Sequence, residues 1–206
     1  MSHTLGIRQA QKQKTRQALM DSALQLLEHQ SLSSLGLREV TRAVGVAPAA
    51  FYRHFKDTAD LGVALVEQAL GSLHETIRAA IVTTGSSDER IDRAVALIAA
   101  HVRAYPAHVR FIARERHGGV APVREAIGVQ LRRFADEVAE ALGADPESAG
   151  WSAEDLRMLA GLYVDHMVMT ASALLEDPPP TPESPALTTA RAQLRLVTLG
   201  RRHWLD

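Results

Sequence analysis

Residues 36–56, GLREVTRAVGVAPAAFYRHFK, constrain the fold of this chain more than any other stretch. Its first half carries apolar residues at positions i, i+3 and i+7, namely Leu37, Val40 and Val44. This spacing places the three side chains on one face of a helix. Gly45 follows where a helix ends in a left-handed turn, and Pro48 suits the first turn of a new helix because its missing N–H leaves no hydrogen bond unmade. The stretch therefore predicts two short helices joined by a glycine turn.

The second of these helices has the character of a DNA-reading helix. Phe51 and Phe55 lie four residues apart and are expected to face inward together. Small residues at the helix start fit a major groove, and polar residues near its end reach outward. The predicted DNA contacts are Arg38, Ala47, Pro48, Ala49, Ala50, Tyr52, Arg53, His54 and Lys56. Phosphate contacts are assigned to Tyr52, His54 and Lys56, and base-edge contacts to residues 47–50 together with Arg53.

The end of this stretch resembles the TetR family of bacterial one-component repressors. The family's helix-turn-helix runs into a Tyr-x-His-Phe type motif, a lysine and an acidic-Leu pair. Here the matching residues are Phe51-Tyr52-Arg53-His54-Phe55-Lys56 and then Asp60-Leu61. Two longer strings, APAAFYRHFKDTADLG and FIARERHGG at 111–119, resemble the branch that represses unsaturated fatty-acid synthesis, the FabR and DesT type. One departure is Ala47, where many family members carry Ser or Thr as a helix cap.

The resemblance implies an all-α, TetR-type fold, with a three-helix helix-turn-helix domain followed by a helical domain that binds an effector and dimerises. Charge supports this division. Residues 1–56 hold eight Lys or Arg against three Asp or Glu, whereas residues 57–206 hold fifteen against twenty-one. A positive part suits DNA phosphates while an acidic remainder stays off the DNA. We therefore expect a DNA-binding domain at 1–56 and an effector-binding and dimerisation domain at 57–206.

The remaining chain is helical by pattern, and nothing in it reads as a sheet. Apolar periodicity and cap residues predict helices over roughly 9–29, 58–81, 86–105, 108–117, 122–142, 152–175 and 185–203. The proline-rich stretch 177–182 predicts an extended loop. The chain has no cysteine and no run of eighteen apolar residues. We expect a cytoplasmic protein without disulfides, signal peptide or membrane span.

The segment from Trp151 to Leu175 is apolar around most of its circumference, and such a helix must be covered on all sides. In the resembled family the last two helices of each subunit form a four-helix dimer interface, and isologous pairing is the commonest arrangement of soluble oligomers. We expect a homodimer that pairs through the helices at 152–175 and 185–203. A charge at Leu174 is expected to break this pairing. The symmetry of the dimer predicts a palindromic double-stranded operator. The alternative is a central helix wrapped by its own subunit.

The larger predicted domain contains side chains that suit a lipophilic effector with phosphates. Methionine and aromatic side chains adapt to apolar ligands, and arginine forks suit phosphates. The resembled branch is understood to respond to acyl-CoA. The candidate ligand-binding residues are Phe111, Arg114, Arg116, Phe134, Met158, Leu162, Tyr163 and Met167. Ordinary core packing and a solvated helix face are the alternatives. The helix at 108–117 is expected to relay binding toward the helix at 58–81, with Arg114 and Arg116 holding phosphates or locking that relay.

No catalytic or metal-binding motif is found among the nine histidines or elsewhere in the sequence. HExxH and GxSxG are missing, and the neighbours Asp165 and His166 lie on different helix faces. We expect neither enzyme activity nor a metal or cofactor. The expected function is repression of fatty-acid composition genes in response to acyl-CoA. Two alternatives stay open: a repressor of the same fold that answers another lipophilic compound, as in efflux control, and an acyl-CoA-binding protein or enzyme without operator specificity.

Overall fold

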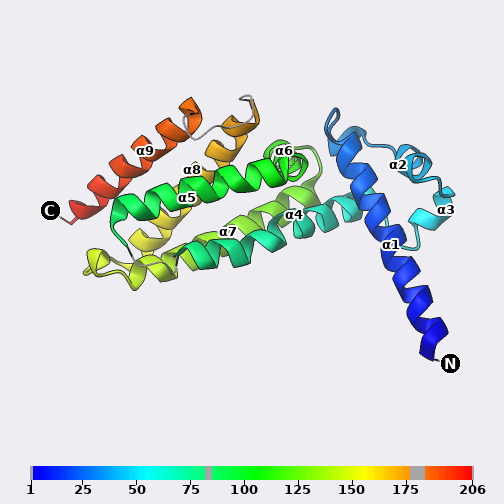
Figure 1. Ribbon diagram of the computed structural model, residues 1–206, viewed down its shortest axis with the longest axis horizontal. Coiled ribbons are helices and arrows are strands. Elements are labelled where there is room, and N and C mark those ends of the chain that lie inside the picture. Colours follow the sequence, from blue (N-terminus) through cyan, green and yellow to red (C-terminus); the bar gives the residue numbers. More distant parts are fainter. Residues whose placement is uncertain (1, 82–84, 177–183, 206) are drawn as a thin grey trace. The chain divides into compact units, whose positions relative to one another are not determined.

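The computed structural model describes residues 2–81, 85–176 and 184–205, which form helices without any strand (Figure 1). The helices are α1 (Ser2–Leu26), α2 (Leu37–Val44), α3 (Pro48–Phe51), α4 (Thr58–Ile81), α5 (Ser87–Ala104), α6 (Pro106–Glu115), α7 (Ala121–Gly143), α8 (Ala153–Glu176) and α9 (Pro185–Arg202), with 3-10 turns η1 (Leu32–Ser34) and η2 (Pro146–Ser148). The all-α fold is thus confirmed. The proline-rich stretch expected to be a loop lies outside the described residues.

The chain divides into two compact units. The first comprises Met1–Ala69 and Arg110–Ile127, and the second comprises Leu70–Val109 and Gly128–Asp206. Three helices, α4, α6 and α7, contribute residues to both units. The first unit therefore contains the helix-turn-helix together with the start of α4, most of α6 and the start of α7. The assignment of DNA binding to 1–56 and of effector binding to 57–206 stays a prediction.

Most helix ends fall close to their predicted positions because the chain carries explicit caps. The Ser86 side chain accepts the Glu89 N–H at the start of α5, and the Glu89 side chain accepts the Ser86 N–H in return. At the start of α4, Asp57 Oδ1 accepts the Asp60 N–H at 2.8 Å, and Asp60 Oδ2 accepts the Lys56 N–H at 2.9 Å. Asp60 of the acidic-Leu pair is therefore a capping residue.

Helix α1 differs from the prediction, because it begins at Ser2 rather than near residue 9. Residues 7–14 are all exposed. Apolar periodicity arises from packing, so it gives no signal over an exposed helical segment such as residues 7–14. Helix α6 also begins earlier than expected, at Pro106, because proline suits the first turn of a helix as well as it ends the preceding one.

The first unit has a core to which all its helices contribute. Its buried apolar side chains include Leu19, Ala23, Leu27, Leu32, Val40, Phe51, Phe55, Leu61, Leu65, Phe111, Ile112, Val123 and Ile127. Gly62 of α4 sits within this core. A Cβ at Gly62 would lie 2.5 Å from Leu32 Cδ2 and 2.7 Å from Val123 Cγ2. Glycine thus lets α4 approach η1 and α7 closely.

The second unit has a core built mainly by α5, α8 and α9. Leu174 of α8 is 1 % exposed within this core. Leu174 is therefore a core residue of its own subunit and not the interface position that the sequence suggested, so a charge there would disrupt this core whether or not the subunits pair. The described residues contain one helix, α8, that is long and apolar enough to cross a membrane, and 22 % of its most apolar window is buried. Because its inner residues belong to this core, α8 is a core helix with further apolar faces left exposed.

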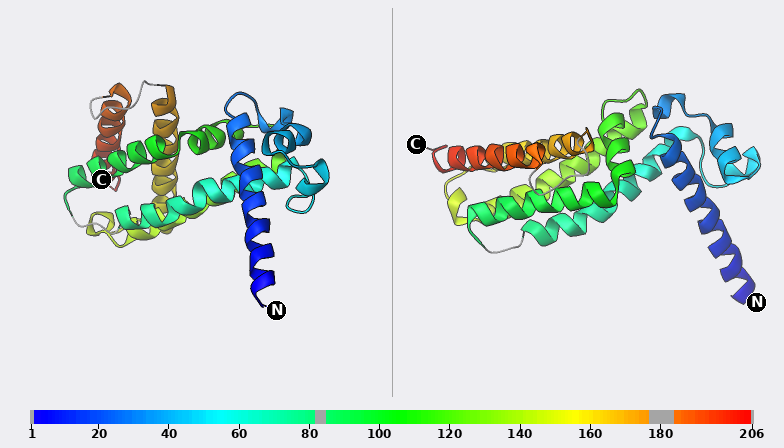
Figure 2. Two further views of the ribbon diagram at one scale, coloured as in Figure 1. Left: turned by 45° about the vertical axis from the view of Figure 1, so that its right-hand side comes forward. Right: turned by 45° about the horizontal axis from the view of Figure 1, so that its top comes forward.

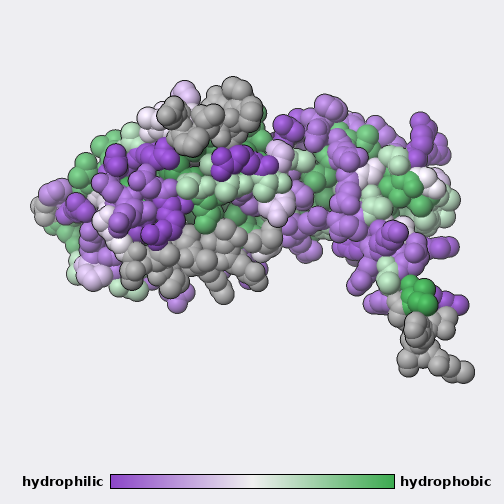
Figure 3. All heavy atoms as spheres, in the orientation of Figure 1, coloured by the Kyte–Doolittle hydropathy of each residue, from purple (hydrophilic) through white to green (hydrophobic). Residues whose placement is uncertain are grey.

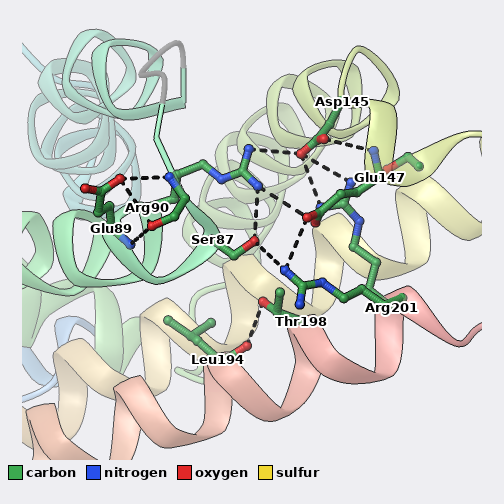
Figure 4. A network of polar contacts seen from close by, with 11 residues as sticks. Ser87, Glu89, Arg90, Asp145, Glu147, Leu194, Thr198 and Arg201 are labelled. Atoms are coloured by element: carbon green, nitrogen blue, oxygen red, sulfur yellow. Dashed lines mark hydrogen bonds and ion pairs between the residues drawn. The ribbon is translucent and has the colours of Figure 1, made fainter.

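An ion-pair network joins η2 to the ends of α5 and α9 in the second unit (Figure 4). Asp145 Oδ2 lies 3.0 Å from Arg90 Nη1 and 3.4 Å from Arg201 Nη2. The Arg201 side chain is 4 % exposed, and its Nη2 also donates to Ser148 Oγ. Burial alone would raise the pKa of Asp145, but the Glu147 N–H and the two arginines outweigh burial and lower it. The network fixes the C-terminal end of α9 to this unit.

Candidate nucleic-acid interface and effector-site residues

The glycine turn between α2 and α3 has the predicted geometry. Gly45 adopts the left-handed conformation, with φ 75° and ψ 27°, and its N–H donates to the Arg42 carbonyl. The Val46 N–H donates to the Thr41 carbonyl at 3.0 Å, which closes the turn. Pro48 then occupies the first turn of α3. The two short helices and their turn confirm the helix-turn-helix expected from residues 36–56.

The α-helical part of the second helix is short, because α3 ends at Phe51. Helical hydrogen bonds nevertheless continue beyond it. The His54 N–H donates to the Phe51 carbonyl at 2.8 Å, and the Phe55 N–H donates to the same carbonyl at 3.0 Å. Ala47, at the N-cap of α3, supplies no side-chain cap, in keeping with its departure from the family's Ser or Thr. The helix instead depends on Pro48 and on the core contacts of its aromatic residues.

Most predicted DNA contacts are on the surface. Phe51 and Phe55 are buried as expected, with ring centroids 5.5 Å apart, and anchor the segment to the first unit. The exposed candidates are Arg38, Ala47, Pro48, Ala49, Tyr52, Arg53 and Lys56, whereas Ala50 and His54 are partly buried. The buried Phe51 and Phe55 therefore hold the segment so that the small side chains at 47–49 and most of the polar side chains that follow them remain exposed.

His54 differs from its predicted outward position. Its Nδ1 is buried and has no hydrogen-bond partner among the described residues. Burial, followed by the positive charges of Lys12, Arg16 and Arg53, lowers the pKa of His54. Since the ordinary value is already near 6.5, the imidazole is mainly neutral at pH 7. His54 can then contact a phosphate only as a neutral hydrogen-bond donor.

Sequence reasoning missed the contribution of α1 to this surface. The Arg16 guanidinium carbon lies 4.5 Å from the centroid of the Phe55 ring, a cation–π contact. Lys12 is close enough to affect the charge of His54. The spacing of Arg8, Lys12 and Arg16, four residues apart each time, is the signal that could have identified them.

In the first unit, the C-terminal end of α6 is fastened to the connection between α1 and η1. Arg114 Nη1 donates to the carbonyls of Leu27 at 2.7 Å and Gln30 at 2.6 Å, and its Nη2 donates to the Glu28 carbonyl at 3.3 Å. These carbonyls follow the end of α1, where backbone acceptors lack helical donors. Of the two roles predicted for Arg114, this geometry favours the locking role over phosphate binding.

Glu115 reinforces this connection from the interior. It is 1 % exposed, and its Oε1 accepts the Leu32 N–H of η1 at 2.9 Å. Its Oε2 is buried without a hydrogen-bond partner among the described residues. A Cβ at Gly118 would collide with this oxygen, so a larger residue there requires the Glu115 carboxylate to shift. No motif or periodicity in the sequence identifies Glu115, because a glutamate between two arginines is typical of the exposed face of a helix.

The other effector candidates are divided between the two units. Phe111 is buried in the first unit, which also holds the partly buried Arg116. Tyr163 and Met167 pack against the core of the second unit. Met158 and Leu162 of α8 are each 50 % exposed. Their exposure agrees better with a protein interface than with an enclosed ligand.

Phe134 lies in a polar setting within the second unit. Its ring centroid is 4.0 Å from that of His74. The imidazole Nε2 lies 2.9 Å from Gln130 Oε1, and Nδ1 lies 3.2 Å from Glu137 Oε1. Within the ranges that the structure describes, no group of three or more His, Cys, Asp or Glu residues could hold a metal ion.

The N-terminal part of the chain matches a known family. Residues 19–65 match the model for bacterial regulatory proteins of the tetR family. The match includes the second part of α1, all of α2 and α3, and the start of α4. The chain therefore has the N-terminal helix-turn-helix of this family on an all-helical fold.

Solved structures of low sequence identity share the fold over most of the chain. FadR from Bacillus subtilis in complex with stearoyl-CoA has a TM-score of 0.71 and 14% identity, over 89% of this chain and 98% of FadR. AibR in complex with isovaleryl coenzyme A and operator DNA has a TM-score of 0.62 and 15% identity, over 88% and 96% of the two chains. A TetR-family regulator from Pectobacterium atrosepticum has a TM-score of 0.62 and 20% identity, over 93% and 95%. At such identities the likeness establishes the fold alone.

Proposed function

We propose that this chain, a DNA-binding transcriptional regulator of the TetR family, represses genes that set the balance of saturated and unsaturated fatty acids and responds to acyl-CoA. TetR-family regulators are not enzymes, so the enzymatic alternative is excluded. The observation that carries the proposal is the helix-turn-helix with its exposed small and polar side chains. In this proposal residues 1–56 bind DNA, and residues 57–206 dimerise and bind the effector.

The proposed DNA contacts follow from exposure and residue type. Residues 47–50 are small enough for a helix to lie close to base edges, with Arg53 beside them. Tyr52, His54 and Lys56 follow on the next turn and hold phosphates, and the exposed Arg38 of α2 adds to them. Because phosphate contacts carry little sequence information, the base preference of this regulator resides mainly in the start of α3.

An acyl-CoA effector is supported by the relatives and by the sequence. FadR binds stearoyl-CoA and AibR binds isovaleryl coenzyme A in structures that share this fold. The string FIARERHGG at 111–119 resembles the FabR and DesT branch. Phe134, Tyr163 and Met167 are the apolar candidates for the acyl chain, and Arg116 is the candidate for a phosphate. The Arg114 and Glu115 contacts then connect α6 to the segment between α1 and η1, which leads into the helix-turn-helix.

Dimerisation through α8 and α9 is supported by the apolar residues left exposed on these helices. They are Met158, Leu162, Met169, Leu196 and Leu199. Soluble single chains seldom expose so many large apolar side chains on two packed helices. A two-fold dimer would present two helix-turn-helix motifs to a palindromic operator in the cytoplasm.

A regulator of the same fold that answers another lipophilic compound is the second candidate. The observation that favours it is the engagement of Arg114 with backbone carbonyls, which removes one of the two predicted phosphate ligands. A ligand without phosphates would need only the apolar candidates. The two candidates differ in effector and share the operator-binding step.

The test is binding of the full-length protein to the promoter region next to its own gene, with and without palmitoyl-CoA and oleoyl-CoA. We expect the protein to bind this promoter region even when competitor DNA of unrelated sequence is present. We also expect its affinity for the promoter to differ between palmitoyl-CoA and oleoyl-CoA. A ligand shifts DNA affinity only by the difference in its affinity for two protein states. If calorimetry detects no binding of either acyl-CoA to the protein, the second candidate is favoured. If both acyl-CoAs bind but the affinity for the operator is the same with each, the protein does not distinguish saturated from unsaturated acyl chains.

A further inference from the structure

Residues 7–14 of α1 form an exposed helical extension in the part of the chain that the structure describes. This extension reaches beyond α2 and α3 in each view (Figures 1 and 2). Helix α1 first buries side chains at Leu19 and Met20. A short exposed helix gains little stability by itself in water, because most helical stability comes from packing. A helical extension of this kind is suited to gain its contacts from a bound partner.

The charge of this extension indicates the chemistry of that partner. Arg8, Lys12 and Arg16 recur every four residues, which places them in one row along the helix. No Asp or Glu precedes Asp21, so no carboxylate of α1 neutralises the row. Most of the face of α1 visible in Figure 3 is hydrophilic. The row spans about 12 Å along the helix axis, a length over which one DNA strand places roughly three successive phosphates when measured along the duplex axis.

The C-terminal end of the row of Arg8, Lys12 and Arg16 lies next to residues that follow α3. Arg16 lies over the Phe55 ring, and Lys12 and Arg16 act together with Arg53 on His54. The positive side chains of α1 therefore converge with those that follow α3. A duplex lying on α3 would meet this row next, at the phosphates beyond the bases that α3 reads.

We propose that Arg8, Lys12 and Arg16 form a phosphate-binding row that extends the DNA interface from α3 along α1, onto backbone flanking each half-site. This inference rests on the proposed DNA-binding function and adds a contact surface to it. The row adds affinity without base preference, because phosphates are alike in every sequence. Arg16 also has a packing role through Phe55 and Met20, whereas Arg8 and Lys12 are exposed and are the residues to test.

Lys14 provides a matched control. It is exposed on the same segment, and it lies two positions from Lys12, about 200° around the helix. Alanine is a good helix former, so Arg8→Ala, Lys12→Ala and Lys14→Ala should all keep the helix. Circular dichroism and the thermal midpoint of each full-length variant check this point.

The experiment measures the salt dependence of binding to two duplexes, the promoter fragment and a 40-bp duplex of unrelated sequence. Each lost phosphate contact lowers the slope of log K against log salt by about 0.9 for each subunit. We expect Arg8→Ala and Lys12→Ala to lower the slope on both duplexes, and Lys14→Ala to leave it unchanged. Wild-type protein should also protect backbone outside the half-sites from hydroxyl radicals, and an Arg8→Ala/Lys12→Ala variant should lose that protection.

Equal slopes for Lys12→Ala and Lys14→Ala, whether both lowered or both unchanged, would overturn the phosphate-binding row. A change of base preference at constant slope would overturn it as well. In each of these cases the wild-type protein still binds the promoter fragment, so the proposed function stands. If wild-type protein binds neither duplex, the proposed function itself fails, and the row fails with it.

Discussion

Two residues of α6, Arg114 and Glu115, stabilise the segment before the helix-turn-helix by bonding to its backbone. Arg114 satisfies carbonyls that follow α1, and Glu115 satisfies the Leu32 N–H at the start of η1. These contacts bond side chains of α6 to backbone groups of a segment more than eighty residues earlier. The contact with Glu115 is buried, and because an unpaired buried N–H is costly, losing this acceptor should destabilise the protein by more than losing the exposed Arg114 contacts.

Glu115→Ala is expected to destabilise the protein by about 1–3 kcal/mol, because it leaves the Leu32 N–H without an acceptor. Glu115→Gln should be milder, since its amide oxygen can still accept this hydrogen bond. Urea unfolding of both variants measures the difference. Glu125→Ala, at an exposed position of α7, is the control and should change stability by less than about 0.5 kcal/mol. A loss with Glu115→Ala no larger than that of the control would contradict this role.

Asp145 should make stability depend on acid. Because its pKa in the folded protein is lowered from the ordinary 3.8, it contributes stability that is fully present above pH 3.8 and is lost as pH falls through the folded pKa. Asp145→Asn also leaves the buried Arg201 with a weaker partner, so we expect a loss of roughly 1.5–3 kcal/mol at pH 7. Urea midpoints at pH 7, 5, 4 and 3 should show wild type and variant converging at low pH. A gap between them that stays constant down to pH 3 would argue against this account.

The helices depend on local signals at their ends, and the turn between α2 and α3 is the most demanding of them. Gly45 has a positive φ that a residue with a Cβ adopts at a cost of about 1–2 kcal/mol. The space around it is open, so any penalty comes from backbone conformation and not from a collision.

Gly45→Ala is therefore expected to destabilise the protein by about 1 kcal/mol and to weaken promoter binding by disturbing the angle between α2 and α3. Gly71→Ala is a suitable comparison, because Gly71 is exposed within α4 and no atom obstructs a Cβ there. That substitution should stabilise by up to about 1 kcal/mol. Thermal unfolding and DNA titration of both variants would settle the point, and a stabilising Gly45→Ala would refute it.

For the molecule as a whole, the proposed dimer explains the apolar residues that α8 and α9 leave exposed. Leu196 is 70 % exposed in the single chain. Leu196→Glu should convert dimers to monomers and abolish cooperative binding to a palindrome, because a buried charge without a partner costs several kcal/mol. Sedimentation equilibrium at micromolar concentration measures the change. Val129→Glu, an exposed apolar residue of α7, is the matched control and should leave the mass unchanged. A wild-type protein that sediments as a monomer would exclude the dimer.

Local patterns in the sequence were enough to predict the all-α fold, the helix-turn-helix and most helix boundaries. These features depend on local physics. A left-handed turn needs Gly45, a helix start needs Ser86 or Asp57, and an apolar stripe needs a period near 3.6, so each can be recognised within a few residues. The exposed candidates for DNA contact were identified for the same reason, because the positions of Phe51 and Phe55 fix which neighbouring side chains face outward.

Contacts between residues that are distant in the sequence became visible only in the folded chain. Glu115 accepts a hydrogen bond from the Leu32 N–H, and Arg114 donates to carbonyls that follow α1. Lys12 and Arg16 lie close enough to His54 to lower its pKa. The fold also divides α8 between a buried side with Leu174 and an exposed side with Leu162. None of these pairings leaves a trace in local spacing, because burial and partnership depend on segments that are far apart in the chain and meet only when the helices pack.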